Sequence, residues 1–367
     1  MKNDKKIVTD ILIFDAHCDT VNVLYNPSSY FVKEDKRHLS IEKARIGGLK
    51  AQIFAMYVNP VYAPYRSIKK ALLLYRTLEN TLFSSGDAIK VTSSLEMESA
   101  LKKDKLVCWL SLEGGHIIEN SIEMLELFYK LGIRCMTLTH SKNTDWADSS
   151  GDEPKHDGLN KLGRRIIEKM NELGMVIDVS HSSDKTVEDV LENSSMPIMA
   201  SHSNARTLCD IPRNLSDDLI REIAERNGYI GVNFYPAFLK KNIYEHVMKN
   251  IEKNSGWFKK EIQGKEDDPD AINKAEMELM LKIVKGNDNI DVNVVIDHII
   301  HIADIGGTNC VGLGSDFDGI PFTPTDLTDV TCYPALVEGL ALRGFKAEEI
   351  QKIMGLNLFY FLKQFDH

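Results

Sequence analysis

Eight short apolar runs rich in β-branched residues recur along this chain of 367 residues, and longer amphipathic stretches separate them. Short runs of this kind are typical of strands buried on both faces, and the amphipathic stretches predict helices that cover them. Gly132, Gly174 and Gly228 stand where predicted helices end, because glycine readily adopts the left-handed conformation that closes a helix. The repeat therefore predicts an α/β protein with a parallel sheet. The predicted strands are residues 11–14, 51–58, 106–112, 134–138, 175–179, 197–200, 229–234 and 310–313.

Polar residues after these runs decide between the two architectures that eight parallel strands can form. In an open sheet the strand ends are spread along an edge, whereas in a closed barrel all eight carboxyl ends point their loops at one mouth. Side chains suited to catalysis or metal binding follow nearly every run. Their convergence favours a (β/α)8 TIM barrel with helical insertions, of the metal-dependent hydrolase type. These residues are His17, Asp19, Glu113, His140, His181, His202, Asn233 and Asp316.

The length fits a single barrel domain over residues 1–367. A (β/α)8 barrel needs about 250 residues, which leaves roughly 117 for insertions. Residues 240–291 lie between the seventh and eighth runs and mix charged with apolar residues, so we expect a helical insertion there. Residues 59–105 contain a second long crossover.

The composition limits the partners and the location of the protein. Its 54 acidic and 44 basic residues give a net charge of −10, which argues against nucleic acid and against a polybasic membrane contact. No apolar run approaches the roughly 18 residues of a membrane span, and Asp10 and Asp15 interrupt the apolar residues near the start. The six cysteines form no C-x-x-C pair, so we expect reduced thiols. These features predict a soluble cytoplasmic protein.

Four predicted strand ends carry residue types that bind divalent metal ions. His17 and Asp19 are two residues apart, so on a strand both side chains point to the same side. Glu113 is followed by two glycines, and His181 and His202 each stand in a Ser-His-Ser sequence. Each motif alone has a common structural reading, such as a helix-capping glutamate or a hydrogen-bonded loop histidine. Together they supply three imidazoles and two carboxylates, which suit two zinc ions with a bridging carboxylate and a shared hydroxide nucleophile.

Three further features have ordinary structural roles as alternatives to a functional one. Asp316 is either another metal ligand or the group that carries a proton from the attacking water to the leaving group. Asp318, in the same glycine-rich sequence, is interpreted as a turn residue outside the site. His298 and His301 lie one helical turn apart in an amphipathic run, so we interpret both as structural residues of a helix. The sequence contains no G-x-S-x-G nucleophile elbow and no Walker-type loop.

Eight short motifs are spread over nearly the whole chain. They are DAHCDT at 15–20, SLEGGH at 111–116, MTLTHS at 136–141 with NTDWADS at 143–149, DVSH at 178–181, ASHSNAR at 200–206, PRNLSD at 212–217, NFYP at 233–236 and GSDFDG at 314–319. In this order they resemble the membrane dipeptidase family, also called renal dipeptidases or M19 metallopeptidases. Eight pieces in one order are highly specific, whereas a single H-x-D is not.

The resemblance implies a role for each residue of the predicted metal site. His17 and Asp19 correspond to ligands of the first zinc ion. His181 and His202 correspond to ligands of the second, and Glu113 corresponds to the carboxylate that bridges both ions.

The resemblance also implies three residues that contact the substrate. Asp316 corresponds to the catalytic aspartate, and His140 to a histidine beside the metals. As a neutral donor, His140 would stabilise a developing oxyanion. Arg213 corresponds to the arginine that grips the free carboxylate of the substrate, a contact that suits guanidinium geometry.

The implied activity is zinc-dependent hydrolysis of free dipeptides, L-Xaa-L-Xaa or L-Xaa-D-Xaa, with two Zn²⁺ per chain. Manganese or cobalt suits the same ligands. Family members are commonly homodimers, and this chain resembles the soluble bacterial branch rather than the lipid-anchored animal one. An alternative is an amidohydrolase-like barrel acting on cyclic amides, lactones or β-lactams, although such enzymes typically begin with H-x-H. A barrel without metal that serves only for binding is the non-enzymatic alternative.

Overall fold

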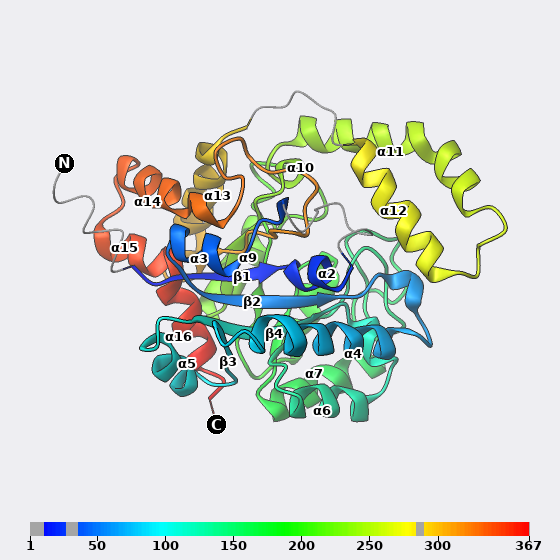
Figure 1. Ribbon diagram of the computed structural model, residues 1–367, viewed down its shortest axis with the longest axis horizontal. Helices are drawn as coiled ribbons and strands as arrows, with labels where there is room; N and C mark the ends of the chain where they lie inside the picture. Colours follow the sequence, from blue (N-terminus) through cyan, green and yellow to red (C-terminus); the bar gives the residue numbers. More distant parts are fainter. Residues whose placement is uncertain (1–10, 27–35, 284–289, 367) are drawn as a thin grey trace.

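A computed structural model describes residues 11–26, 36–283 and 290–366 of the chain (Figure 1). Its strands pair in parallel in the order β2-β1-β9-β8-β7-β6-β5-β4-β3, and an additional pairing between β2 and β4 closes the sheet on itself. Eight strands form the ring, because β2 also pairs directly with β4. The predicted (β/α)8 barrel is therefore confirmed. The strands are β1 Ile13–Cys18, β2 Leu49–Tyr57, β3 Ala88–Lys90, β4 Leu106–Glu113, β5 Cys135–Thr137, β6 Val176–Asp178, β7 Met199–Ala200, β8 Tyr229–Val232 and β9 Val311–Leu313.

Strand β3, which is additional to the eight predicted strands, was not predicted from the sequence. It pairs with the first half of β4, where Ala88 is opposite Leu106, whereas β5 pairs with the second half, where Cys135 is opposite Ser111. Strand β3 thus lies outside the ring of eight. Its sequence ends in a lysine and only Ala88 is buried, so it does not give the continuous apolar run by which a buried strand is recognised.

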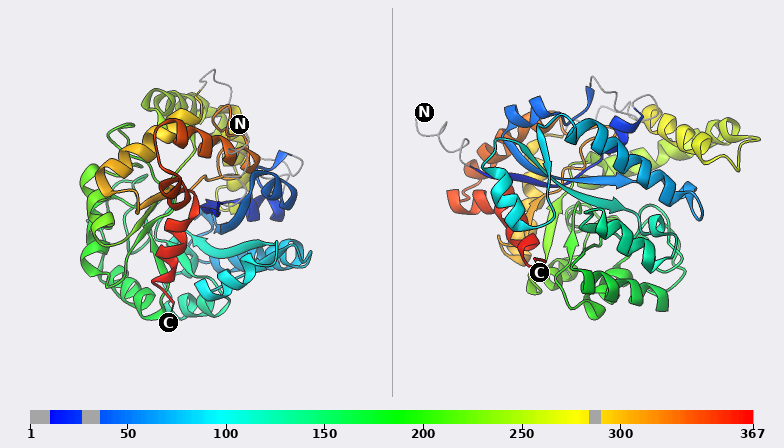
Figure 2. Two further views of the ribbon diagram at one scale, coloured as in Figure 1. Left: turned by 90° about the vertical axis from the view of Figure 1, so that its left-hand side faces the viewer. Right: turned by 60° about the horizontal axis from the view of Figure 1, so that its bottom comes forward.

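Helices surround the barrel, as the views in Figure 2 show. They are α2 Thr20–Tyr25, α3 Ile41–Gly47, α4 Ser67–Leu78, α5 Ser94–Leu101, α6 Ile122–Lys130, α7 Lys161–Leu173, α8 Asp184–Asn193, α9 Asp217–Glu225, α10 Pro236–Leu239, α11 Lys241–Ile262, α12 Pro269–Ile283, α13 Val292–Gly306, α14 Tyr333–Leu342, α15 Ala347–Gln351 and α16 Asn357–Lys363. Among the described residues, no helix is long and apolar enough to cross a membrane.

Helix α7 illustrates how the sequence specifies these elements. The Asn160 side chain caps its start by accepting hydrogen bonds from two backbone N–H groups, and Gly174 closes its end in the left-handed conformation. Ile166, Ile167 and Met170 are buried on one face, while charged residues occupy the other. The apolar face therefore packs the helix against the barrel.

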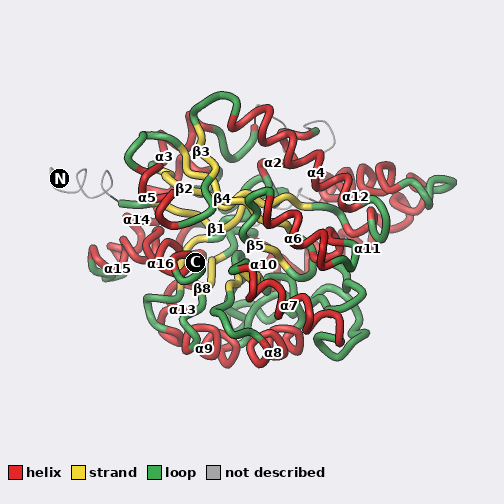
Figure 3. The backbone as a smooth tube through the Cα atoms, turned by 90° about the horizontal axis from the view of Figure 1, so that it is seen from below, coloured by secondary structure: helices red, strands yellow, loops and turns green. Residues whose placement is uncertain are grey.

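The two ends of the barrel are built differently. At the amino ends of the strands, α16 packs against β1, β8 and β9, and the Phe361 ring lies 6.0 Å from the Tyr229 ring. The carboxyl ends carry long loops and two of the four helices that the structure describes between β8 and β9. These two, α11 and α12, project beyond the ring of helices (Figures 1 and 3). These two helices lie within residues 240–291, the expected insertion, of which 284–289 fall outside the described residues. The expected crossover at 59–105 contains α4, β3 and α5, together with the short 3-10 helix η3 (Pro60–Tyr62).

Candidate metal centre and substrate cavity

Five predicted metal ligands lie together at the carboxyl ends of the strands. His17 Nε2 lies 3.5 Å from Asp19 Oδ2 and 3.5 Å from Glu113 Oε2. The other carboxylate oxygen, Glu113 Oε1, lies 3.4 Å from His181 Nε2 and 3.7 Å from His202 Nε2. Glu113, at the end of β4, therefore turns one oxygen toward each half of the ligand set.

The spacing and the unpaired atoms of this group fit divalent metal ions. Two ligand atoms that are each about 2.1 Å from one tetrahedral ion lie about 3.4 Å apart, close to the separations found here. His17 Nε2, Asp19 Oδ1 and Glu113 Oε2 are buried and have no hydrogen-bond partner among the described residues. His181 Nε2 and His202 Nε2 lie 2.8 Å apart. Buried polar atoms without partners cost free energy, and bound cations would remove that cost.

His140 and Asp316 lie at the edge of the same group. His140 Nε2 lies 3.6 Å from Glu113 Oε1, and Asp316 Oδ1 lies 4.0 Å from His17 Nε2. Each offers a ligand atom within 4.8 Å of two other potential ligands. Asn233 Nδ2 donates to Asp316 Oδ2 at 2.9 Å, so the Asp316 carboxylate is fixed between this amide and the centre.

Arg213 comes from the loop between β7 and α9. Its guanidinium donates to Ser203 Oγ at 2.9 Å and to the His202 carbonyl oxygen at 2.8 Å. Its Nε is buried and finds no hydrogen-bond partner in the part of the chain that the structure describes, and the guanidinium carbon lies 5.3 Å from the centre of the Phe238 ring. The loop that carries His202 therefore also holds a cation beside the centre.

Comparison with known proteins identifies the family. A model of the membrane dipeptidase family, peptidase family M19, matches residues 1–367. The chain belongs to this family. It is 27% identical to Dipeptidase 3 of Macaca fascicularis over 369 residues, which cover 98% of this chain and 66% of that protein. It is 32% identical to Dipeptidase tcpJ of Claviceps purpurea (strain 20.1) over 264 residues, which cover 72% of this chain and 52% of that protein.

The chain thus spans between about half and just under two thirds of the length of these two curated relatives. Among solved structures, it resembles a metallopeptidase from Rhodobacter sphaeroides liganded with a phosphinate mimic of the dipeptide L-Ala-D-Ala. The TM-score is 0.76, with 24% identity, and the match covers 96% of this chain and 99% of that chain. This likeness establishes a shared fold.

Burial sets the charges in this M19 centre. Burial and the neighbouring Glu113 carboxylate raise the pKa of Asp19 to about 7, and burial raises the pKa of Asp316 to about 7. Burial also lowers the pKa of both His181 and His202 well below the usual range, so these imidazoles are neutral. Although burial opposes it, the Glu113 and Asp19 carboxylates raise the pKa of His17, in contrast, well above its usual range. Without a bound cation, the centre would therefore combine two neutral imidazoles with a protonated His17 and with carboxyl groups that hold protons near neutral pH. Divalent ions would compete with those protons.

Asp178, at the end of β6, orients one of the histidines. Ser201 Oγ lies 2.7 Å from His202 Nδ1 and donates to Asp178 Oδ2 at 2.6 Å. The backbone N–H groups of Ser180 and Ser201 both donate to Asp178 Oδ1, at 3.0 and 2.9 Å. Because His202 Nδ1 is engaged in this way, its Nε2 faces the centre.

Asp15, in β1, supports the other side of the centre. Its Oδ1 accepts from the backbone N–H groups of His17 and Ser315, both at 3.0 Å, and its Oδ2 accepts from the Tyr333 hydroxyl. The sequence alone predicts no role in the site for Asp15 or Asp178. The signal that could reveal them is a carboxylate inside an apolar strand, two or three residues before a histidine of the candidate site.

Local backbone conformation brings the acidic groups close together. His181 and Asp316 have φ values of 67° and 63°, which are uncommon for residues other than glycine and cluster at functional sites. A Cβ at Gly319 would lie 2.1 Å from Asp19 Oδ2 and 2.4 Å from Asp316 Oδ1. Only glycine therefore leaves room for these two carboxylates where they stand.

A cavity of about 600 Å³ opens above the centre. Asp19, Glu113, His140, Arg213 and Asp316 line its lower part. We call α11 and α12 the roof, because their residues line the upper part. Cavities of this size accommodate small organic ligands. The apolar lining residues include Phe238, Tyr244, Ile251, Phe258, Met277 and Met280, none of which lies in a motif recognised from the sequence.

His298 and His301 have structural partners in other parts of the barrel. His298 is buried in α13, accepts from the Ala205 backbone N–H at 3.2 Å, and lies 3.1 Å from the Leu239 carbonyl oxygen. His301 Nε2 lies 2.8 Å from Asp217 Oδ1. These contacts agree with the structural interpretation of both histidines.

Proposed function

We propose that this protein is a metallo-dipeptidase that hydrolyses the peptide bond of free dipeptides, L-Xaa-L-Xaa or L-Xaa-D-Xaa. The observation that carries the proposal is the buried Glu113 carboxylate, whose two oxygens face two sets of nitrogen and oxygen ligands. A carboxylate in this position suits two metal ions. Membership of the M19 family and the dipeptide mimic bound to the Rhodobacter relative support the same reaction class.

We assign His17 and Asp19 to one ion, His181 and His202 to the other, and Glu113 to both. Imidazole and carboxylate ligands suit zinc, with manganese and cobalt as alternatives. When bound, two such ions would polarise the substrate carbonyl and lower the pKa of a water molecule toward neutrality.

Three other side chains have roles in the proposed reaction. Asp316, held by Asn233, accepts the proton of the attacking water and passes it to the departing amine. His140 is neutral, because burial lowers its pKa to about 3, and it donates a hydrogen bond to the developing oxyanion. Arg213 pairs with the C-terminal carboxylate of the substrate, which favours a dipeptide over a longer chain.

The test is hydrolysis of L-L, L-D and D-D dipeptides by the purified protein, loaded with zinc and after chelation. We expect chelator-sensitive cleavage of free dipeptides, with C-terminally amidated ones spared. Failure to cleave any dipeptide after metal loading would contradict the proposal and turn the search to cyclic amides, lactones and β-lactams. Metal analysis of protein purified from cells that were grown without added metal would identify the native ion.

Location and assembly are also part of the proposal. All six cysteines are unpaired, as expected in a reducing cytoplasm. We propose that the enzyme is cytoplasmic, that each chain forms a single barrel domain, and that two chains form a homodimer. Light scattering of the purified protein would test the dimer, and fractionation of the source cells would test the location.

A further inference from the structure

A carboxylate outside the proposed metal ligands also lines the substrate cavity. This residue, Glu276, belongs to α12 in the roof. Three side chains of α12 at intervals of three residues contact the segment that follows β2. Asp270 Oδ1 accepts from the Tyr62 hydroxyl at 2.5 Å, and Asn273 Oδ1 accepts from Asn59 Nδ2 at 3.0 Å. Glu276 Oε2 accepts from the same Asn59 amide at 2.5 Å.

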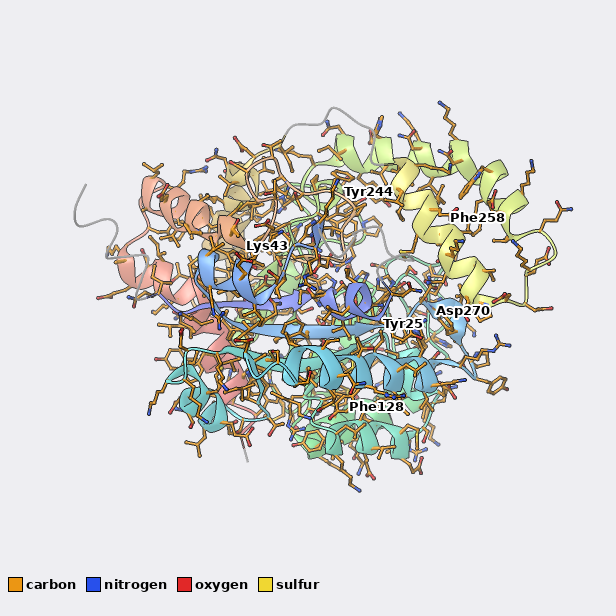
Figure 4. All side chains as sticks on the ribbon, in the orientation of Figure 1. Tyr25, Lys43, Phe128, Tyr244, Phe258 and Asp270 are labelled. Atoms are coloured by element: carbon orange, nitrogen blue, oxygen red, sulfur yellow. The ribbon has the colours of Figure 1, made fainter. Side chains whose placement is uncertain are left out.

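These contacts fix the N-terminal half of α12 over one side of the barrel mouth. Lys70 Nζ of α4 lies 3.8 Å from Asp270 Oδ1 and 4.5 Å from the centre of the Tyr25 ring. Figure 4 labels Asp270 and Tyr25 in this region, with Phe258 and Tyr244 higher on the roof. The N-terminal half of helix α12 is therefore held against the barrel.

The attachment places Glu276 near the metal centre. Asn59 follows β2 by two residues, and Tyr57, the last residue of β2, is the register partner of Glu113 in β4. The Tyr57 ring also lies 4.5 Å from the His140 ring. The charges of Glu276 and Glu113 both act on the Tyr57 hydroxyl, and all three residues line the cavity.

The charge of Glu276 is only weakly compensated within the described part of the chain. No ion pair to it is found there, and the Lys142 ammonium, whose charge acts on it, pairs with Asp152 at 3.4 Å and is 63% exposed. Burial raises the pKa of Glu276, an effect that the Asn59 hydrogen bond opposes. A half-buried carboxylate in a largely apolar cavity is stabilised by a cation that enters with the ligand.

We propose that Glu276 binds the free α-ammonium group of the N-terminal residue of the substrate. This inference rests on the proposed dipeptidase function. A free dipeptide carries one carboxylate and one ammonium group, and the cavity offers Arg213 for the first and Glu276 for the second. The enzyme then recognises both charged ends of its substrate by opposite charges, while the apolar residues of the roof surround the N-terminal side chain.

The experiment compares Leu-Leu with isocaproyl-leucine, which lacks only the α-ammonium group, in the metal-loaded enzyme. For wild type we expect a higher kcat/KM for Leu-Leu. In Glu276→Gln, which keeps an acceptor for Asn59, kcat/KM for Leu-Leu should fall about 10- to 100-fold, mainly through KM. The value for isocaproyl-leucine should not change. The control Glu278→Gln alters a carboxylate two residues away that does not line the cavity and pairs with Lys274 at 3.9 Å, and it should match wild type.

A binding measurement tests the same inference where cleavage is too slow for kinetics. Calorimetry with the phosphinate mimic of Leu-Leu and with its des-amino analogue should show the same preference in wild type, reduced about 10- to 100-fold in Glu276→Gln. Equal losses on both ligands, or no loss on either, would overturn the inference. If wild type neither binds nor cleaves these ligands after metal loading, the proposed function itself is rejected instead.

A further pair of substrates tests which ammonium group is recognised. Lys-Leu and norleucyl-leucine share the α-ammonium group and differ in the side-chain ammonium. If Glu276→Gln changes only the preference between these two and leaves the Leu-Leu comparison unchanged, Glu276 recognises a side chain and the α-ammonium assignment is wrong.

Discussion

The metal centre and the roof line the same cavity but are held in place differently. The centre stands on strand ends, where Asp15 and Asp178 accept hydrogen bonds from backbone N–H groups of the proposed ligands or of residues next to them. The roof is a helical excursion whose α12 is tied to the barrel by the side chains of Asp270, Asn273 and Glu276. Rigid strand ends suit reaction chemistry, and connecting segments tolerate sequence change. We infer that the centre sets the reaction and the roof sets the substrate.

The strongest test of this division removes the shared ligand. Glu113→Gln leaves a neutral amide between the two ligand sets, so we expect loss of at least one metal ion and a fall in kcat of about 10³-fold or more. Metal analysis after zinc loading and kinetics on Leu-Leu would measure both effects. Circular dichroism should show an intact barrel. A fully active variant would remove Glu113 from its assigned place.

The second test disturbs the distance between two carboxylates without changing any ligand. In Gly319→Ala the new methyl group would lie 2.1 Å from Asp19 Oδ2, so Asp19 and Asp316 must move apart. We expect kcat to fall about 100-fold, because displacements of about 1 Å at a reacting centre have effects of this size. Thermal unfolding, measured alongside, separates this effect from a loss of folding. Unchanged kinetics would show that the two carboxylates need not be this close.

The sequence predicted the centre better than the roof for a physical reason. His17 and Asp19 are close in sequence and end a strand, so spacing alone brings them to one side. The barrel then brings the other strand ends to the same mouth, and the family motifs supplied the individual roles. Contacts between distant segments leave no spacing signature. Asn59 and Glu276 are 217 positions apart, and Asp15 and Tyr333 are 318 apart.

The third test asks whether support behind a ligand matters as much as the ligand. Asp178→Asn keeps the size of the side chain but removes the charge that fixes Ser201 against His202 Nδ1. We expect a 10- to 100-fold loss of metal affinity, with a smaller loss of activity at saturating zinc. Competition with a chelating dye would measure the affinity. Wild-type affinity in this variant would mean that Ser201 alone orients the histidine.

The smallest effect is expected from the roof, and it should depend on the substrate. Met280 lines the cavity, and Met280→Ala should raise KM for Leu-Leu about three- to tenfold, since each methylene that loses its contact costs about 0.8 kcal/mol. Values of kcat and of zinc content should stay at wild-type levels, and Ala-Ala should be nearly unaffected. Leu281→Ala is the matched control, because Leu281 is the next residue of α12 and is 48% exposed. If Met280→Ala instead lowers kcat for both substrates equally, the roof acts on the reaction as well, and the division between the two regions does not hold.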